Sequence, residues 1–277
     1  MTIERTALPY FESPPVIETV LGVFFRPVSQ LNSVWQGVFW RECLQSDFPE
    51  FELRPPTEEA VERFAPDSQP FQPEVRWQFS AEPEAPRLWA KSPTGEHILQ
   101  VQRNALLANW LRRNNYRRFE ERLREFESRA SQLETFISRN SLTDGPLVPA
   151  SCTVTYVNHI ELGEQESWST ALGRTIQMWT ADASDEWLPP VERARVQLSF
   201  AFPERRGRLH VSARPAQPKD TGNTVLQLEL TGRVMLSGEP VGIPGLIAGL
   251  KTAHEWVVRG FTAITRAEMH QTWGRIQ

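Results

Sequence analysis

The chain has 277 residues, of which 40% are hydrophobic and 23% charged, and its formal net charge at pH 7 is −4. These values are ordinary for a globular protein and exclude a disordered or fibrous chain. The small negative charge gives no general attraction to nucleic acid or to acidic membranes. No basic stretch followed by an apolar run opens the sequence, and no segment approaches the roughly 20 apolar residues that cross a bilayer. We therefore expect a cytoplasmic protein.

Sequence motifs for catalysis or cofactor binding are missing. The two cysteines, Cys43 and Cys152, belong to neither a C-x-x-C nor a histidine-paired spacing, which argues against a zinc site or a disulfide framework. The sequence contains no P-loop, no G-x-G-x-x-G and no G-x-S-x-G. We expect no metal, no cofactor and no catalytic group, which favours a non-enzymatic protein.

Hydrophobic periodicity predicts four strands and two helices in the first half of the chain. Apolar residues alternate along the strands, and they recur every three or four residues along the helices. Ser29 is a plausible N-cap for the first helix. A proline-rich connection, residues 49–73, joins that helix to the second strand. The predicted strands are residues 17–25, 75–79, 88–91 and 97–110, and the predicted helices are residues 29–39 and 116–137.

The same order begins again after the break at Asp144-Gly145-Pro146. A turn at Gly242-Ile243-Pro244-Gly245 leads into the last helix, whose apolar stripe runs from Leu250 to Ile264. We read this turn as structural and not as an anion site. The predicted strands are residues 152–162, 196–202, 209–213 and 226–236, and the other predicted helix is residues 168–179.

The repeated order predicts an α+β protein made of two βα-βββ-α halves, residues 1–145 and 146–277, joined as one pseudo-twofold unit. Strands joined by short turns pair antiparallel, and long helices are then free to cover one face of the sheet. We expect one curved antiparallel sheet with helices on one face, in the manner of the TATA-box-binding-protein saddle. The alternative is a helix-grip arrangement with a cavity under the last helix.

Short stretches along the whole chain resemble a known family. They are Pro14–Glu18, Leu99–Arg103 with Asn109-Trp110, Tyr116–Glu120, Tyr156–Ile160, and the set His254-Glu255, Phe261, Ile264-Thr265 and Trp273. In these pieces the chain resembles a sporadically distributed prokaryotic family of uncharacterised proteins. The resemblance implies no particular chemistry. The family's patchy distribution is similar to that of mobile or defence-island genes, which implies a role in a defence or toxin-neutralising system.

Strand alternation predicts a polar, basic face on the side of the sheet away from the helices. Where Leu88, Val196, Leu209 and Leu228 face the helices, the intervening residues face the other way. An open antiparallel face is polar in any case, and Glu161 and Glu229 are acidic exceptions. The candidate binding residues on this face are Arg76, Gln100, Gln102, Arg195, Arg208, His210, Gln227, Arg233 and His159. We expect Arg195, Arg208 and Arg233 to form one patch with exposed guanidinium groups.

Two other polar residues are interpreted as structural. His254 lies on the apolar stripe of the last helix, so we expect it to pack toward the core. Asn158 points inward from its strand, where we expect the backbone of an adjacent strand to satisfy it.

Three functions remain open. The first is a binding or regulatory protein that engages another protein through the open face. The second is a nucleic-acid-binding protein that uses the same basic face, which steep salt dependence would reveal. The third is a small-molecule enzyme or ligand binder with a cavity beneath the last helix.

Overall fold

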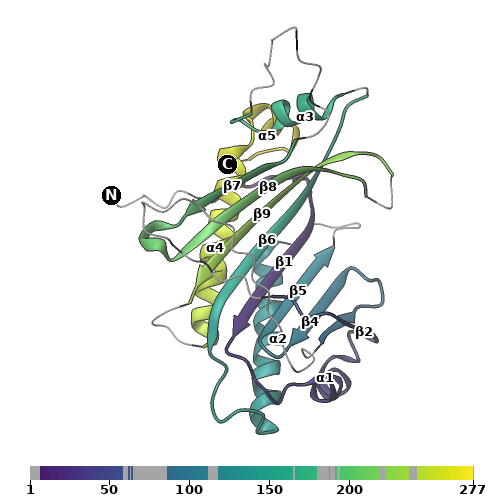
Figure 1. The fold of residues 1–277 in the computed structure, drawn as a ribbon, viewed down its shortest axis with the longest axis vertical. Coiled ribbons are helices and arrows are strands. Elements are labelled where there is room, and N and C mark those ends of the chain that lie inside the picture. The colour runs from purple at the N-terminus through teal and green to yellow at the C-terminus, as the bar shows by residue number, and fades with distance from the viewer. Residues whose placement is uncertain are drawn as a thin grey trace.

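A computed structural model describes residues 7–58, 62, 64, 86–111, 118–164, 166–179, 187, 191, 194–218, 222–236 and 242–276. In these residues the protein is α+β, with one antiparallel sheet of nine strands (Figure 1). The strands are β1 (Val16–Phe25), β2 (Glu50–Arg54), β3 (Arg87–Lys91), β4 (His97–Gln102), β5 (Ala105–Leu111), β6 (Pro149–Glu161), β7 (Val196–Ala201), β8 (Gly207–Ala216) and β9 (Val225–Met235). Their order across the sheet is β2-β3-β4-β5-β1-β6-β9-β8-β7.

The helices pack on one side of this sheet. They are α1 (Ser33–Phe39), which continues as the π-helix η1 (Trp40–Leu44), α2 (Phe119–Arg139), α3 (Trp168–Thr175), α4 (Ile243–Ile264) and α5 (Ala267–Thr272). A short 3-10 turn, η2 (Pro203–Arg205), lies between β7 and β8. Figure 1 shows the two long helices, α2 and α4, behind the sheet, with α3 and α5 together near one end of it. Phe126 of α2 and Phe261 of α4 are both buried.

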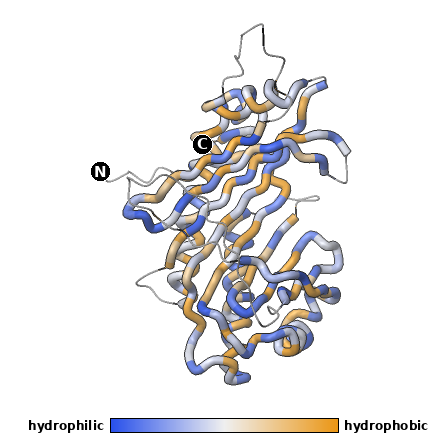
Figure 2. The backbone as a smooth tube through the Cα atoms, viewed as in Figure 1, coloured by the Kyte–Doolittle hydropathy of each residue, from blue (hydrophilic) through white to orange (hydrophobic). Residues whose placement is uncertain are grey.

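Side chains alternate along the strands as the period of two predicts, and Figure 2 shows this alternation in hydropathy. On β9, Leu226, Leu228 and Leu230 are fully buried on the helix side, while Gln227 and Glu229 point the opposite way and are half-buried. The same phase continues across the hydrogen-bonded partners of β9. We call the side of the sheet opposite the described helices the open face.

The first half departs from its predicted strands at one hairpin. The run predicted as one strand over residues 97–110 is two strands, β4 and β5, joined by a two-residue turn at Arg103 and Asn104. Another strand, β2, lies inside the proline-rich connection. The strand predicted at 75–79 lies outside the described residues.

Helix starts also differ from the prediction. The first helix is capped by Asn32 and not by Ser29, because the Asn32 side chain accepts the N–H groups of Val34 and Trp35. The second helix begins at Phe119, after Arg118 in extended backbone.

The two central strands, β1 and β6, each open one half of the chain and pair with each other. On one side of this pair lie β5, β4, β3 and β2, and on the other lie β9, β8 and β7. The strand order is thus similar on both sides apart from the additional β2. That the halves superpose as repeats in a saddle stays a prediction.

Two glycines let α4 approach the sheet closely. A Cβ on Gly232 of β9 would lie 2.6 Å from the carbonyl oxygen of Ala253 in α4. A Cβ on Gly249 of α4 would lie 2.7 Å from the sulfur of Cys152 in β6. Both distances are too short for real contacts, so only glycine allows this spacing of helix and sheet.

Among the described helices, none combines the length and the apolar character that a membrane span requires.

Candidate functional site

The open face holds most of the predicted binding residues. The register pairs Arg208 of β8 with Arg233 of β9, and His159 of β6 with Gln227 of β9. His210 lies on the same face two residues after Arg208. Gln100 and Gln102 belong to β4, on the other side of the central strands.

A carboxylate clamp occupies the β8–β9 part of this face. Arg208 Nη1 donates to Glu62 Oε2 at 2.5 Å, and Arg233 Nη1 donates to Glu62 Oε1 at 2.5 Å. His210 Nε2 donates to the same Oε1 at 2.6 Å. The Glu62 side chain is only 2% exposed. Three donors from two strands therefore enclose one carboxylate that belongs to the segment between β2 and β3, and we call these four residues the carboxylate clamp.

The clamp favours the ionised form of Glu62. Burial alone would raise the pKa of Glu62, but the hydrogen bond from His210 and the charges of His210, Arg233 and Arg208 outweigh it. The net effect lowers the pKa of Glu62 to about 2. The carboxylate is therefore ionised at neutral pH, as a salt-bridged group requires.

A second contact holds the same segment on β4. Gln102 accepts the backbone N–H of Thr57 at 2.9 Å and donates to the Thr57 carbonyl oxygen at 2.9 Å. One amide side chain thus pairs with both polar groups of one backbone residue, in the way that an adjacent strand would. Gln102 is buried beneath this contact. We call the described residues 55–58, 62 and 64 the covering segment.

The two contacts lie far apart on the face. β4 and β9 are separated by β5, β1 and β6, which makes about 19 Å at the usual strand spacing. Phe64 adds a third contact, since the guanidinium of Arg208 lies 4.5 Å from its ring centroid. The covering segment is thus held on the open face at two places, one on each side of the central strands β1 and β6.

A row of hydrogen-bonded polar side chains runs across β4, β5 and β1 on the open face, apart from the clamp. Gln100 Nε2 donates to Asn109 Oδ1 at 2.5 Å, and Asn109 Nδ2 donates to Glu18 Oε1 at 2.6 Å. Burial lowers the pKa of His159, while its hydrogen bond with Gln227 and the charge of Glu18 oppose that shift. Gln100, His159 and Gln227 are therefore held by neighbours on the sheet and lie outside the clamp.

The predicted arginine patch is wrong in two respects. Arg208 and Arg233 are not openly exposed: their side chains are 23% and 15% exposed, because Glu62 covers them. Arg195 precedes β7 and lies six residues from Ala201, the partner of Arg208, which is about 20 Å along a strand. Arg195 is exposed but outside the clamp. Arg76 lies outside the described residues.

A small hollow adjoins the clamp between β7, β8 and β9. Its volume is about 220 Å³, and Ser199, His210, Ser212, Glu229 and Thr231 belong to its lining. Ser199 Oγ lies 3.1 Å from Nδ1 of His210, the ring nitrogen that does not contact Glu62. The clamp is therefore accessible from one side through a polar hollow.

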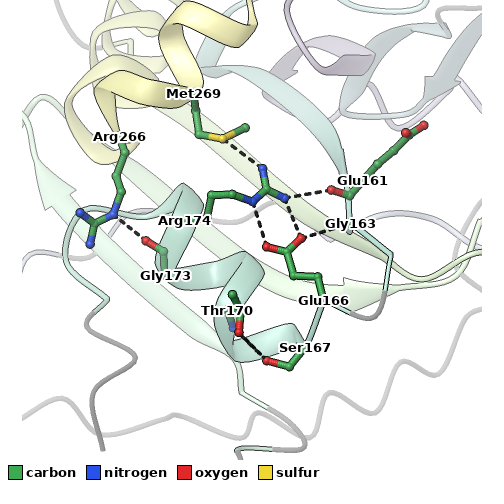
Figure 3. A network of polar contacts seen from close by, with 9 residues as sticks. All are labelled: Glu161, Gly163, Glu166, Ser167, Thr170, Gly173, Arg174, Arg266 and Met269. Atoms are coloured by element: carbon green, nitrogen blue, oxygen red, sulfur yellow. Dashed lines mark hydrogen bonds and ion pairs between the residues drawn. The ribbon is translucent and has the colours of Figure 1, made fainter.

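A second carboxylate–arginine cluster lies at the end of β6 (Figure 3). Arg174 of α3 donates to both oxygens of Glu166 at 2.9 Å, and its Nη2 also donates to the carbonyl oxygen of Glu161 at 3.1 Å. The hydrogen bond from Arg174 lowers the pKa of Glu166. Arg266, which precedes α5, donates to the Gly173 carbonyl oxygen. This network ties α3 to β6 and α5, which is a structural task.

Metal chemistry finds no support within the described ranges, where no three His, Cys, Asp or Glu side chains come together as a metal site would need. Comparisons of the chain with family models, with curated proteins and with solved structures find no match. The chemistry of the open face is therefore the starting point for a function.

Proposed function

We propose that the protein is a non-enzymatic binding protein whose open face takes up an acidic polypeptide segment of another protein. The observation that carries the proposal is the carboxylate clamp, in which Arg208, His210 and Arg233 converge on Glu62 within 2.6 Å. Arginine suits this task because its planar guanidinium matches a carboxylate. The covering segment is then an internal occupant of the site that the partner displaces.

The contact with Thr57 supports a polypeptide as the ligand. Gln102 recognises a backbone N–H and a backbone carbonyl together, and a nucleic acid has no such pair in its backbone. Three acidic residues on the same face, Glu18, Glu161 and Glu229, would repel phosphates. A polypeptide that carries a single carboxylate at the clamp avoids that repulsion.

The resemblance to a family with a defence-like distribution makes a toxin or nuclease encoded by a neighbouring gene the first partner to test. In that setting binding would hold the partner inactive. The partner's own acidic segment would replace the covering segment.

A peptide-exchange experiment tests the proposal on the full chain. The probe is a fluorescent peptide with the sequence of residues 55–64. In the wild type the tethered segment competes at an effective concentration in the millimolar range, so the peptide binds weakly. Glu62→Ala weakens the tethered copy, and we expect the peptide to bind at least tenfold more tightly to this variant.

The control is Glu58→Ala, which removes the same charge from an exposed position of the covering segment and should leave peptide affinity at the wild-type value. Adding Arg233→Ser to Glu62→Ala should abolish the gain. Equal affinities for wild type and Glu62→Ala would contradict the proposal. Binding of single-stranded DNA with log affinity falling linearly in log salt, without peptide binding, would instead favour the nucleic-acid function.

A further inference from the structure

A cavity of about 440 Å³ lies on the helix side of the sheet, away from the open face. It is open on one side and lined by α4, the start of α2, β6 and the chain before β1. That chain is fixed to the residues that follow α5, since Ile276 N–H donates to the Tyr10 carbonyl and Glu12 N–H donates to the Gly274 carbonyl, both at 3.0 Å. Most of the lining is apolar or aromatic, including Tyr10, Phe11, Val16, Phe119, Val258 and Phe261.

Aromatic rings give the cavity flat walls. The His254 imidazole of α4 stacks on the Phe119 ring of α2, with ring centroids 3.7 Å apart and planes within 2°. Phe11 meets Phe261 edge to face at 5.5 Å. The Tyr156 ring lies 5.9 Å from His254. A planar molecule can stack on such walls and gain beyond its buried area.

Asn158 supplies a polar group in this wall. It is 1% exposed, and its Nδ2 donates to the Leu228 carbonyl oxygen of β9 at 2.9 Å, which confirms the expected bond to an adjacent strand. This bond fixes the orientation of the amide, and Oδ1 has no hydrogen-bond partner among the described residues. A buried acceptor without a donor costs free energy, so a ligand N–H is favoured there once the wall shifts enough to expose this oxygen, which has almost no accessible surface in the structure.

A bulge lies beside this group. Between Val16 and Glu18, β1 contains one residue more than the facing part of β6, where Val16 pairs with Asn158 and Glu18 with Val157. Bulges of this kind are frequent next to binding sites, because they change the direction of side chains.

The surroundings favour an uncharged ligand, because the two charged residues of the lining, Arg118 and Glu120, are exposed and opposite in sign. Burial, together with the nearby charge of Arg122, lowers the pKa of His254 to about 3, so the imidazole is neutral at physiological pH. The same desolvation would penalise a charged ligand. Neutral imidazole carries one donor and one acceptor nitrogen, which suits a heteroaromatic partner.

We propose that this cavity binds an uncharged, planar heteroaromatic molecule whose N–H group donates a hydrogen bond to Asn158 Oδ1. The site shares no residue with the carboxylate clamp, so its test is independent of the test of the proposed function. His254, which we interpreted as a structural core residue, then becomes part of a ligand wall.

Methyl NMR of the full chain tests this site with indole as the probe. Indole is planar and neutral and has one N–H. We expect it to shift the methyl signal of Ile276, which lines the cavity, and to leave that of Ile98, which is on the open face, unchanged. 1-Methylindole lacks the donor and should bind about five- to tenfold more weakly, and indole-3-carboxylate at least tenfold more weakly.

A cavity-filling variant adds a second measurement. Val258→Trp should reduce indole affinity at least tenfold, whereas Ala263→Trp, at an exposed position of the same helix, should not. The site is overturned if indole does not bind, if Ile276 does not respond, or if Val258→Trp in its folded form binds as the wild type does. Equal affinity for indole and 1-methylindole would refute the role of Asn158.

Discussion

The two carboxylate–arginine clusters of this protein differ in how their charges balance. At the end of β6, Glu166 meets one arginine, Arg174, eight residues away in the chain. On the open face, Glu62 meets two arginines and a histidine that follow it by 146 to 171 residues. The first cluster is a matched pair that fixes a helix, as Figure 3 shows. The second surrounds one carboxylate with two guanidinium groups and an imidazole, so within the clamp the positive charge of the two arginines exceeds the charge of Glu62.

The largest expected difference between the clusters is their response to acid. The folded pKa of Glu62, about 2, lies below the usual value of 4.5 for a glutamate. The stability it contributes is therefore complete above pH 4.5 and is lost as the pH falls toward 2. A shift of this size corresponds to about 3 kcal/mol.

Urea unfolding at pH 6 and pH 2.5 should show this loss in the wild type and not in Glu62→Gln. Glu58→Gln is the matched control and should behave as the wild type does. If Glu166→Gln reduced the loss of unfolding free energy between pH 6 and pH 2.5 as much as Glu62→Gln does, the expected difference between the two clusters would be wrong.

A smaller effect is expected when Arg174 is removed. Its side chain is 38% exposed, so solvent weakens the pair, although both oxygens of Glu166 are bound. Arg174→Ala should cost about 1–2 kcal/mol of unfolding free energy, because the bond to the Glu161 carbonyl is lost as well. A double-mutant cycle with Glu166→Ala should give a coupling of about 1 kcal/mol. A coupling near zero would mean that the pair is only a surface contact.

The smallest effect concerns the cap of the same helix. Ser167 Oγ accepts the Thr170 N–H at 3.1 Å at the start of α3. Ser167→Ala should cost about 1 kcal/mol or less, measured as a change in melting temperature. Ser46→Ala, at an exposed serine outside any cap, should change it less. A loss larger than that of Arg174→Ala would show that the cap, and not the ion pair, anchors α3.

Strand periodicity predicted the open face well in the second half. Arg208, His210, Gln227 and Arg233 lie on the predicted side because β8 and β9 each keep one phase throughout. The apolar stripe predicted for the last helix, from Leu250 to Ile264, is buried in α4, as the period of 3.6 predicts.

The missed hairpin had a signal in the sequence. The buried apolar side chains on the helix side fall on odd numbers at Leu99 and Val101 and on even numbers at Leu106, Ala108 and Trp110, while Gln100 and Gln102 are buried on the open face. A single strand cannot change phase without a bulge or a turn, and Asn104 is a residue that turns accept. The change of phase therefore located the turn between β4 and β5.

No local pattern could place Glu62. It lies in a proline-rich connection without periodicity, and its partners come from strands more than a hundred residues later. Alternation identifies a face but cannot tell what covers it, so Arg208 and Arg233 were predicted to be exposed.

Because α4 packs closely on the sheet, the rate at which Cys152 is alkylated reports how often the helix separates from the sheet. Cys152 is fully buried beneath Gly249, and burial raises the pKa of its thiol, so almost no thiolate is available to react. Cys43 is only half-buried and should be alkylated first. A reagent can reach Cys152 only when α4 separates from β6, so the alkylation rate of Cys152 depends on the frequency of that separation. A ligand in the cavity under α4 should slow the alkylation of Cys152, while a peptide on the open face should leave that rate unchanged.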